Sequence, residues 1–113
     1  MSDQAMKANA GKVRLSLLPA VALHDMARVR EFGAAKYAAW DWTKGRAWSE
    51  YVDAMLRHLV AFNAGEDCDP ESGLPHMAHV MCSAAFLLEF ARTKPELDDR
   101  PKGQIVNPLT PGA

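Results

Sequence analysis

The chain has 113 residues, of which 49% are hydrophobic and 24% charged, and its formal net charge is −1. This composition excludes the disordered and collagen-like classes, and the length suits one domain. The near-neutral charge offers no electrostatic basis for binding a nucleic acid polymer, which normally requires a basic face. A domain of this size buries only roughly two-thirds of its unfolded surface, so oligomerisation is an effective way to gain stability.

The N-terminal residues 1–15 are small and polar, and we expect a flexible arm there. No apolar run resembles a signal peptide or is long enough to span a bilayer, so we expect a cytoplasmic protein with no membrane partner. The two cysteines, Cys68 and Cys82, lack the CxxC spacing of a zinc site. We therefore expect free thiols.

The helical period first appears after Ser16, which can cap a helix, with Pro19 tolerated in the first turn. The apolar stripe of this first helix continues to Phe32, and Gly33 comes near its end. Residues 36–48, KYAAWDWTKGRAW, then form a predicted loop that is rich in aromatic and basic side chains.

Two more helices are predicted after this loop. The second covers residues 49–65, with Ser49 as its N-cap. An acidic loop, residues 66–72, leads into a third helix that Ser72 caps and that ends at about Arg92. The third helix is apolar nearly all round, which is typical of a helix surrounded by other helices.

The predicted fold is therefore all-α, a small helical hairpin or bundle. Two neighbouring helices hardly cover the third, so we expect a second copy of the chain to complete the packing, as a homodimer or homotetramer. The predicted division is an arm at 1–15, a helical domain at 16–92 that carries the candidate site, and a Pro-rich tail at 93–113.

Two pairs of acids repeat the spacing acid-x-x-acid. Glu50 and Asp53 begin the second helix, whereas Glu66 and Asp69 lie in the acidic loop and are followed by Glu71. Carboxylates that converge in a helical hairpin repel one another unless a divalent cation lies between them, and oxygen-only ligation suits Mg²⁺ or Mn²⁺. The alternative is a solvated helix start and a solvated loop.

Basic side chains accompany these acids. Arg57 can pair with Asp53 at i,i+4 or bind a phosphate, and His58 is either structural or part of the site. His76 and His79 share one face of the third helix. They can bind a metal, donate to phosphate or act as acid and base, or the loop acids can satisfy them as buried imidazoles.

The aromatic loop offers contacts for a nucleotide. Lys36 can neutralise a phosphate, and Tyr37, Trp40 or Trp42 can stack on a base. The alternative is that these rings only cover the core. Beside a metal–phosphate site, the sequence favours the substrate-binding interpretation.

The acid spacing resembles the E-x-x-E…E-x-x-D signature of the MazG-like all-α nucleoside triphosphate pyrophosphatases, with Asp53 in place of a Glu. More specifically, GKVRLSLLP, GAAKYAAWDW and YVDAMLRHLVAFNAGEDCDPESGLPHMAHVMCSAAFLL resemble the phage and bacterial dATP/dGTP diphosphohydrolases. The likeness runs from about Gly11 to Phe90. Members of that family generally read K-Y-G…N-W, where this chain has Ala38 and Asp41, so the preferred base is left open.

The resemblance implies metal-dependent hydrolysis of a (deoxy)nucleoside triphosphate, such as dGTP or dATP, to the monophosphate and pyrophosphate. It also implies a helical oligomer in a bacterial or phage-infected cytosol, with Mg²⁺ or Mn²⁺ as cofactor. Carried over by position, the metal-ligand candidates are Glu50, Asp53, Glu66, Asp69 and Glu71, with Glu50 or Glu71 as the general base. The substrate-binding candidates are Lys36, Tyr37, Trp42, Arg57, His58, His76 and His79.

Two alternatives stay open. The doublet His24–Asp25 matches part of the ligand set of HD-type dNTP triphosphohydrolases, although that set needs an upstream histidine and His24 is the first in the chain. The other alternative is a non-enzymatic helical interaction module that oligomerises through its third helix.

Overall fold

The computed structural model describes residue 8 and residues 10–102, and within them it is built from helices. The elements in chain order are η1 (Leu15–Leu17), α2 (Ala20–Lys36), η2 (Asp41–Lys44), α3 (Trp48–Asn63), α4 (His76–Thr93) and η3 (Pro95–Leu97). The only β-type pairing in the described residues is an isolated bridge between Cys68 and Pro75. The all-α prediction is therefore confirmed.

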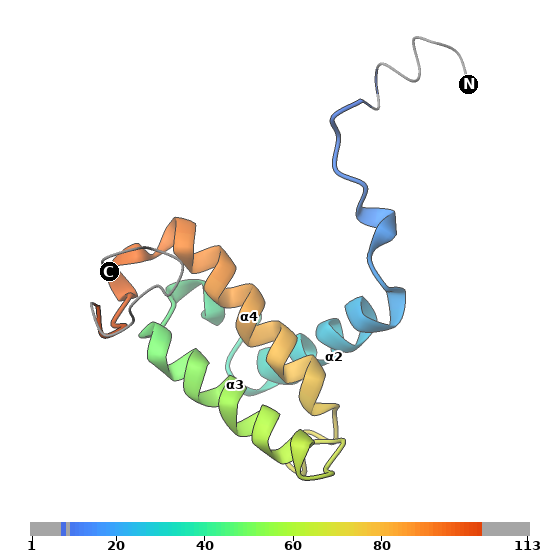
Figure 1. Cartoon of the computed structure of the whole chain (residues 1–113), viewed down its shortest axis with the longest axis vertical. Coiled ribbons are helices and arrows are strands. Elements are labelled where there is room, and N and C mark those ends of the chain that lie inside the picture. Colours follow the sequence, from blue (N-terminus) through green and yellow to red (C-terminus); the bar gives the residue numbers. More distant parts are fainter. Residues whose placement is uncertain (1–7, 9, 103–113) are drawn as a thin grey trace, which may run out of the picture.

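The helix α4 is the centre of the fold, because it packs against both α3 and α2. Figure 1 shows α3 and α4 side by side as a hairpin, with the acidic loop joining them at one end. The segment before α2 leads away from the helices in the same view. None of the described helices is both long enough and apolar enough to cross a membrane.

A small core joins α2 to α4. Val29 of α2 packs with Ala78 and Cys82 of α4, and Met26 and Leu74 pack against them. The small side chains on α4 let the two helices approach closely, and the Cys82 thiol donates to the backbone carbonyl of Met26 at 3.4 Å. Both cysteines are free thiols, as predicted.

An aromatic cluster occupies the other half of α4. The ring of Trp42 stacks on Phe86 with centroids 5.3 Å apart, and Tyr51 of α3 meets Phe90 at 5.5 Å. Phe90 is only 1% exposed. These contacts hold the segment that contains η2 against α4, so the predicted aromatic loop is anchored by one of its own tryptophans.

Prolines decide where two helices begin, which corrects the predicted caps. The helix α2 has Pro19 at its N-cap, and the preceding Leu18 is extended, with ψ of 141°. The helix α4 begins after Pro75, and Ser72 lies in the preceding loop. Because a residue before proline is disfavoured in the helical region, neither helix extends back to the predicted serine.

The start of α3 is also different from the prediction. The helix begins at Trp48, and the backbone N–H and hydroxyl of Ser49 both donate to the carboxylate of Asp99, at 2.9 and 2.5 Å. The guanidinium of Arg100 lies 4.9 Å from the Trp48 ring. The beginning of the predicted tail therefore lies against the first turn of α3 and supplies the carboxylate that caps it.

Candidate functional site

A cleft of about 710 Å³ opens between α2, η2 and α3, with Phe86 of α4 contributing to its lining. Five of the predicted site residues line this cleft: Tyr37, Trp42, Glu50, Asp53 and Arg57. They come from three separate elements, which the packing of α2 and α3 on the central α4 brings together.

The cleft combines basic and acidic side chains. Arg46 lies 3.9 Å from Glu50, and Lys44 pairs with Asp41 at 2.9 Å. Asp53 has no ion-pair partner among the described residues, so the Asp53–Arg57 pair considered from the sequence is not formed. An exposed carboxylate without a partner, close to several cations, is available for a ligand.

Aromatic rings form the apolar part of the cleft. Tyr37 is 57% exposed at the end of α2, with the ammonium of Lys36 5.4 Å from its ring and the guanidinium of Arg46 5.9 Å away. Tyr51 lies deeper, and burial raises the pKa of its phenol above the usual value. Trp42 presents to the cleft a ring whose other contacts hold it in place.

Two arginines in the cleft were missed by the sequence analysis. Arg30 and Gly33 share one face of α2, and Tyr37 follows directly after the helix. Arg46 precedes Glu50 by four residues. Periodicity of the charged and aromatic residues, examined in the same way as the apolar ones, would have shown both.

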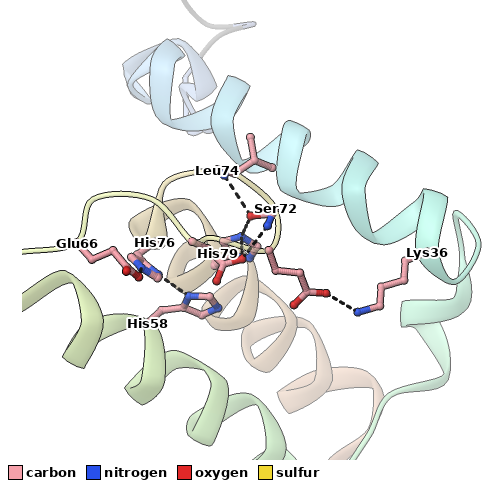
Figure 2. A network of polar contacts seen from close by, with 9 residues as sticks. Lys36, His58, Glu66, Ser72, Leu74, His76 and His79 are labelled. Carbon is pink, nitrogen blue, oxygen red and sulfur yellow. Dashed lines mark hydrogen bonds and ion pairs between the residues drawn. The ribbon is translucent and has the colours of Figure 1, made fainter.

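A second polar group lies at the loop end of the α3–α4 hairpin (Figure 2). The Nδ1 atoms of His58 and His76 are 2.8 Å apart, and His76 Nε2 lies 2.7 Å from Glu66 Oε1. When both rings are neutral, His76 donates through Nε2–H to the carboxylate, so its Nδ1 accepts the Nδ1–H of His58. The two histidines and Glu66 thus form one hydrogen-bonded chain.

Asp69 and Ser72 organise the acidic loop beside these histidines. The backbone N–H of Ser72 donates to Asp69 Oδ2 at 3.0 Å, and the hydroxyl of Ser72 lies 2.7 Å from His79 Nε2. The ring of His79 stacks on that of His58, with centroids 4.5 Å apart and planes inclined by 5°. A short polar turn therefore fixes the orientation of two imidazoles.

Burial controls the charge of this group. Desolvation lowers the pKa of His58 and of His79 below the usual value, and the nearby imidazoles add to the shift at His58. The pKa of the Asp69 carboxyl is lowered: desolvation opposes the shift, but hydrogen bonds from Ser72 and nearby histidines outweigh it. Burial therefore favours the neutral forms of His58 and His79, and the lowered pKa of Asp69 favours its carboxylate form.

Lys36 connects the histidine group, which consists of His58, His76 and His79 with the adjoining acidic loop, to the cleft. Its ammonium pairs with Glu71 at 2.8 Å, which raises the pKa of the lysine through that hydrogen bond (Figure 2). The next residue, Tyr37, lines the cleft. This ion pair thus holds the acidic loop at the C-terminal end of α2, next to the cleft.

The structure divides the five predicted acids between these two places. Glu50 and Asp53 lie at the cleft, whereas Glu66, Asp69 and Glu71 lie in the acidic loop at the other end of α3. Their assignment as metal ligands stays a prediction.

The residues that the structure gathers most closely for a metal are of mixed type. Among the described residues, one set of His, Cys, Asp and Glu side chains has ligand atoms all within 4.8 Å of one another: His58, Asp69 and His76. Two imidazoles and one carboxylate fit a divalent cation.

The His24–Asp25 doublet is not part of the set of possible metal ligands that the described residues bring together. His24 Nδ1 is 3.6 Å from Asp25 Oδ1 within the first half of α2, and the histidine side chain is 69% exposed.

Known proteins match the part of the chain that carries the cleft and the histidines. The family model described as "dATP/dGTP diphosphohydrolase, N-terminal" matches residues 2–100. A dATP/dGTP diphosphohydrolase of Salmonella phage PMBT28 is 33% identical over 95 residues, which are 84% of this chain and 32% of the relative. The chain thus spans about a third of the length of that relative. No solved structure matches the chain, and the MazG-like relationship stays a prediction.

The family match extends over α2, α3 and α4, and so over both the cleft and the histidine group. The chain therefore belongs to the dATP/dGTP diphosphohydrolase family, in the part that corresponds to its N-terminal domain.

Proposed function

We propose that this chain hydrolyses a purine deoxynucleoside triphosphate, such as dGTP or dATP, to the nucleoside monophosphate and pyrophosphate. One observation carries the proposal: a single cleft of about 710 Å³ combines arginines, aromatic rings and the carboxylate of Asp53, which has no ion-pair partner among the described residues. A triphosphate requires cations for its oxygens, a base requires an aromatic surface, and the cleft offers both. The name of the phage relative agrees with this substrate class.

In this proposal the substrate lies along the cleft. Arg57, with Arg30 and Arg46, binds the phosphate oxygens, because a planar guanidinium can donate two parallel hydrogen bonds to them. The purine stacks against Tyr37 or Trp42.

The cleft carboxylates suit a hard divalent cation. Glu50 and Asp53 would hold Mg²⁺ or Mn²⁺, because both ions prefer oxygen ligands. The acidic loop offers further ligand candidates, which are Glu66, Asp69 and Glu71. When bound, such an ion offsets the charge of the polyphosphate and lowers the pKa of coordinated water.

The side chains of the chain itself would handle the proton and the leaving group. Glu50 or Glu71 takes the proton of the water that attacks the α-phosphorus, and the bond between the α-phosphorus and the α–β bridging oxygen breaks. Lys36 and Arg57 offset the charge of the departing pyrophosphate, for which Lys36 exchanges Glu71 for a phosphate oxygen. The rings of His58, His76 and His79 contact phosphate or position the loop acids.

We further propose that the active form is a homodimer or homotetramer of the cytosol, with no nucleic acid polymer or membrane among its partners. Apolar side chains on the outer face of α3 support a second copy, since Leu56 is 52% and Val60 is 69% exposed.

The test is a panel of deoxynucleoside and ribonucleoside triphosphates incubated with the protein and Mg²⁺ or Mn²⁺, with the products separated by ion exchange. The expected result is dGMP or dAMP with an equal amount of pyrophosphate. Release of triphosphate would favour the HD-type alternative instead. No turnover, together with no thermal stabilisation by millimolar nucleotide and metal, would favour the non-enzymatic module.

A further inference from the structure

We propose that His58, Asp69 and His76 form a binding site for a divalent transition-metal ion at the loop end of the α3–α4 hairpin, separate from the carboxylates of the cleft. This site goes beyond the proposed nucleotide hydrolysis, because it needs no nucleotide and uses nitrogen ligands. Its preferred ions are of the Mn²⁺, Co²⁺ and Zn²⁺ type, and it discriminates against Mg²⁺.

The three ligands converge from separate parts of the chain. His58 comes from the middle of α3, Asp69 from the acidic loop and His76 from the first position of α4. Their ligand atoms all lie within 4.8 Å of one another. Nitrogen and oxygen ligands bind such ions at about 2.0–2.2 Å, so opposite ligands lie about 4 Å apart and small side-chain rotations complete the site.

When both rings are neutral, the two histidines share one proton at the place where the ion would bind. Their Nδ1 atoms face each other at 2.8 Å. A cation placed between them takes both Nδ1 lone pairs, and the proton of His58 moves to its Nε2 atom. No proton is gained or lost by the pair in this exchange.

Surrounding groups hold each ligand in place, as is usual around bound metals. Glu66 accepts a hydrogen bond from His76 Nε2 at 2.7 Å, which is the carboxylate–histidine arrangement that fixes a metal-binding imidazole. His76 is only 3% exposed, so this ring is the fixed ligand and the small rotations that complete the site belong to the half-buried His58 and Asp69. The stacked ring of His79 orients His58, and the N–H of Ser72 restrains one oxygen of Asp69.

The type of ligand determines the type of ion. Two imidazoles with one carboxylate favour first-row transition metals, whereas Mg²⁺ prefers oxygen ligands and retains its water. Three protein ligands also leave positions for water, as in metal sites that bind or activate small molecules. The cleft carboxylates of Glu50 and Asp53 are oxygen-only and lie toward the start of α3, so the two places differ in chemistry.

The test is a titration of EDTA-treated, nucleotide-free protein with Co²⁺, followed by its visible absorption, with calorimetry for Mn²⁺ and Zn²⁺. We expect one ion per chain with an absorption band typical of nitrogen ligation, and no displacement by a thousandfold excess of Mg²⁺. His58→Gln and Asp69→Asn should each weaken Co²⁺ binding at least about 100-fold, and Glu66→Gln about 10- to 100-fold.

Matched variants separate this site from the cleft. Glu50→Gln and Asp53→Asn should leave Co²⁺ binding at the histidine site unchanged, whatever they do to turnover of dGTP. Circular dichroism checks that the His58 and Asp69 variants are folded. Absence of Co²⁺ binding by the wild type, displacement by Mg²⁺, or wild-type binding by folded His58→Gln would each overturn the proposal, and none of them bears on whether the cleft hydrolyses nucleotides.

Discussion

Asp53 is a carboxylate placed among cations without an ion-pair partner in the described part of the chain. An acid in this position contributes little to the fold, because its side chain is exposed and makes no ion pair with the residues that the structure describes. The Asp53 carboxylate is instead available to bind a ligand. A substitution at Asp53 therefore tests whether the cleft is catalytic, because it should change turnover and leave the stability of the fold nearly unchanged.

We predict that Asp53→Asn lowers the turnover of dGTP on the order of 100-fold or more, since an uncharged amide holds a divalent cation poorly and that cation is worth several kcal/mol. Steady-state kinetics with Mn²⁺ measure the effect, and the Tm should stay close to that of the wild type. Glu31→Gln, on the exposed side of α2 and outside the cleft, is the matched control. Near-normal turnover in Asp53→Asn would place the cation elsewhere.

Ala38 carries backbone strain at the cleft. Its φ is 135°, and it is the non-glycine residue with positive φ in the described ranges. A side chain in this region of φ costs about 1–3 kcal/mol, and such strain concentrates at functional sites.

We predict that Ala38→Gly stabilises the protein by about 1 kcal/mol, because relief of the strain outweighs the extra entropy of an unfolded glycine. Urea denaturation measures the free energy of unfolding. The adjacent Ala39→Gly change should destabilise by about 0.5–1 kcal/mol, because Ala39 has no positive φ to relieve. Equal effects of the two substitutions would contradict the assigned conformation.

At the scale of elements, the first turn of α3 depends on a residue from beyond α4. Asp99 accepts hydrogen bonds from the N–H and the hydroxyl of Ser49, and these bonds lower the pKa of its carboxyl below 3.8. Glu50 follows directly in the same turn and lines the cleft. The segment after η3 therefore supports one wall of the site.

We predict that Asp99→Ala lowers the Tm by about 2–5 °C at pH 7, since a helix start loses its capping carboxylate. The folded-state pKa is below the unfolded one, so this stabilisation is present above pH 3.8 and is lost as the pH falls further. The Tm difference from wild type should thus shrink below about pH 4. Glu96→Ala, an exposed acid on η3, serves as the control. A difference that stays constant down to pH 2.5 would show that the carboxylate charge is not involved.

The sequence predicted the three main helices because each has an apolar period and a turn signal at its ends. It misplaced their starts, since a proline overrides a nearby serine cap and since the cap of α3 comes from Asp99, fifty residues away from Ser49. Long-range capping leaves no local pattern in a sequence. Such a contact is visible only when the fold is known.

The sequence also identified side chains of both polar groups without predicting how they are grouped. From Glu50 to Asn63 the helix α3 rises about 20 Å at about 1.5 Å per residue, which separates the first acid pair from the acidic loop. The spacing along the chain predicts that the two acid pairs converge only if the length of α3 is left out of account. The neighbours of His58 depend on the path of the loop, which the turn around Asp69 and Ser72 determines.

At the scale of the whole molecule, α3 exposes more apolar surface than its pattern predicts. Val52, Leu56, Leu59 and Val60 are 37–69% exposed along its outer face. These residues recur at three- and four-residue spacing, as in a helix that packs against another helix. A second copy of the chain would cover this face.

We predict that the wild type elutes as a dimer or tetramer in size-exclusion chromatography with light scattering. The double change Leu56→Glu and Val60→Glu should shift the mass toward the monomer, because charges on a buried interface are costly. Leu23→Glu, an exposed apolar residue on α2, is the control. A monomeric wild type at micromolar concentration would remove the case for a second copy.

In the proposed function, the cleft between α2, η2 and α3 binds the triphosphate. A crystal structure with Mn²⁺ and the α,β-methylene analogue of dGTP, which cannot be cleaved between those phosphates, tests it most directly. We expect phosphates in contact with Arg57, a cation bound by Asp53, and the purine against Tyr37 or Trp42. A nucleotide bound on another surface, with this cleft empty in the same crystal, would contradict it.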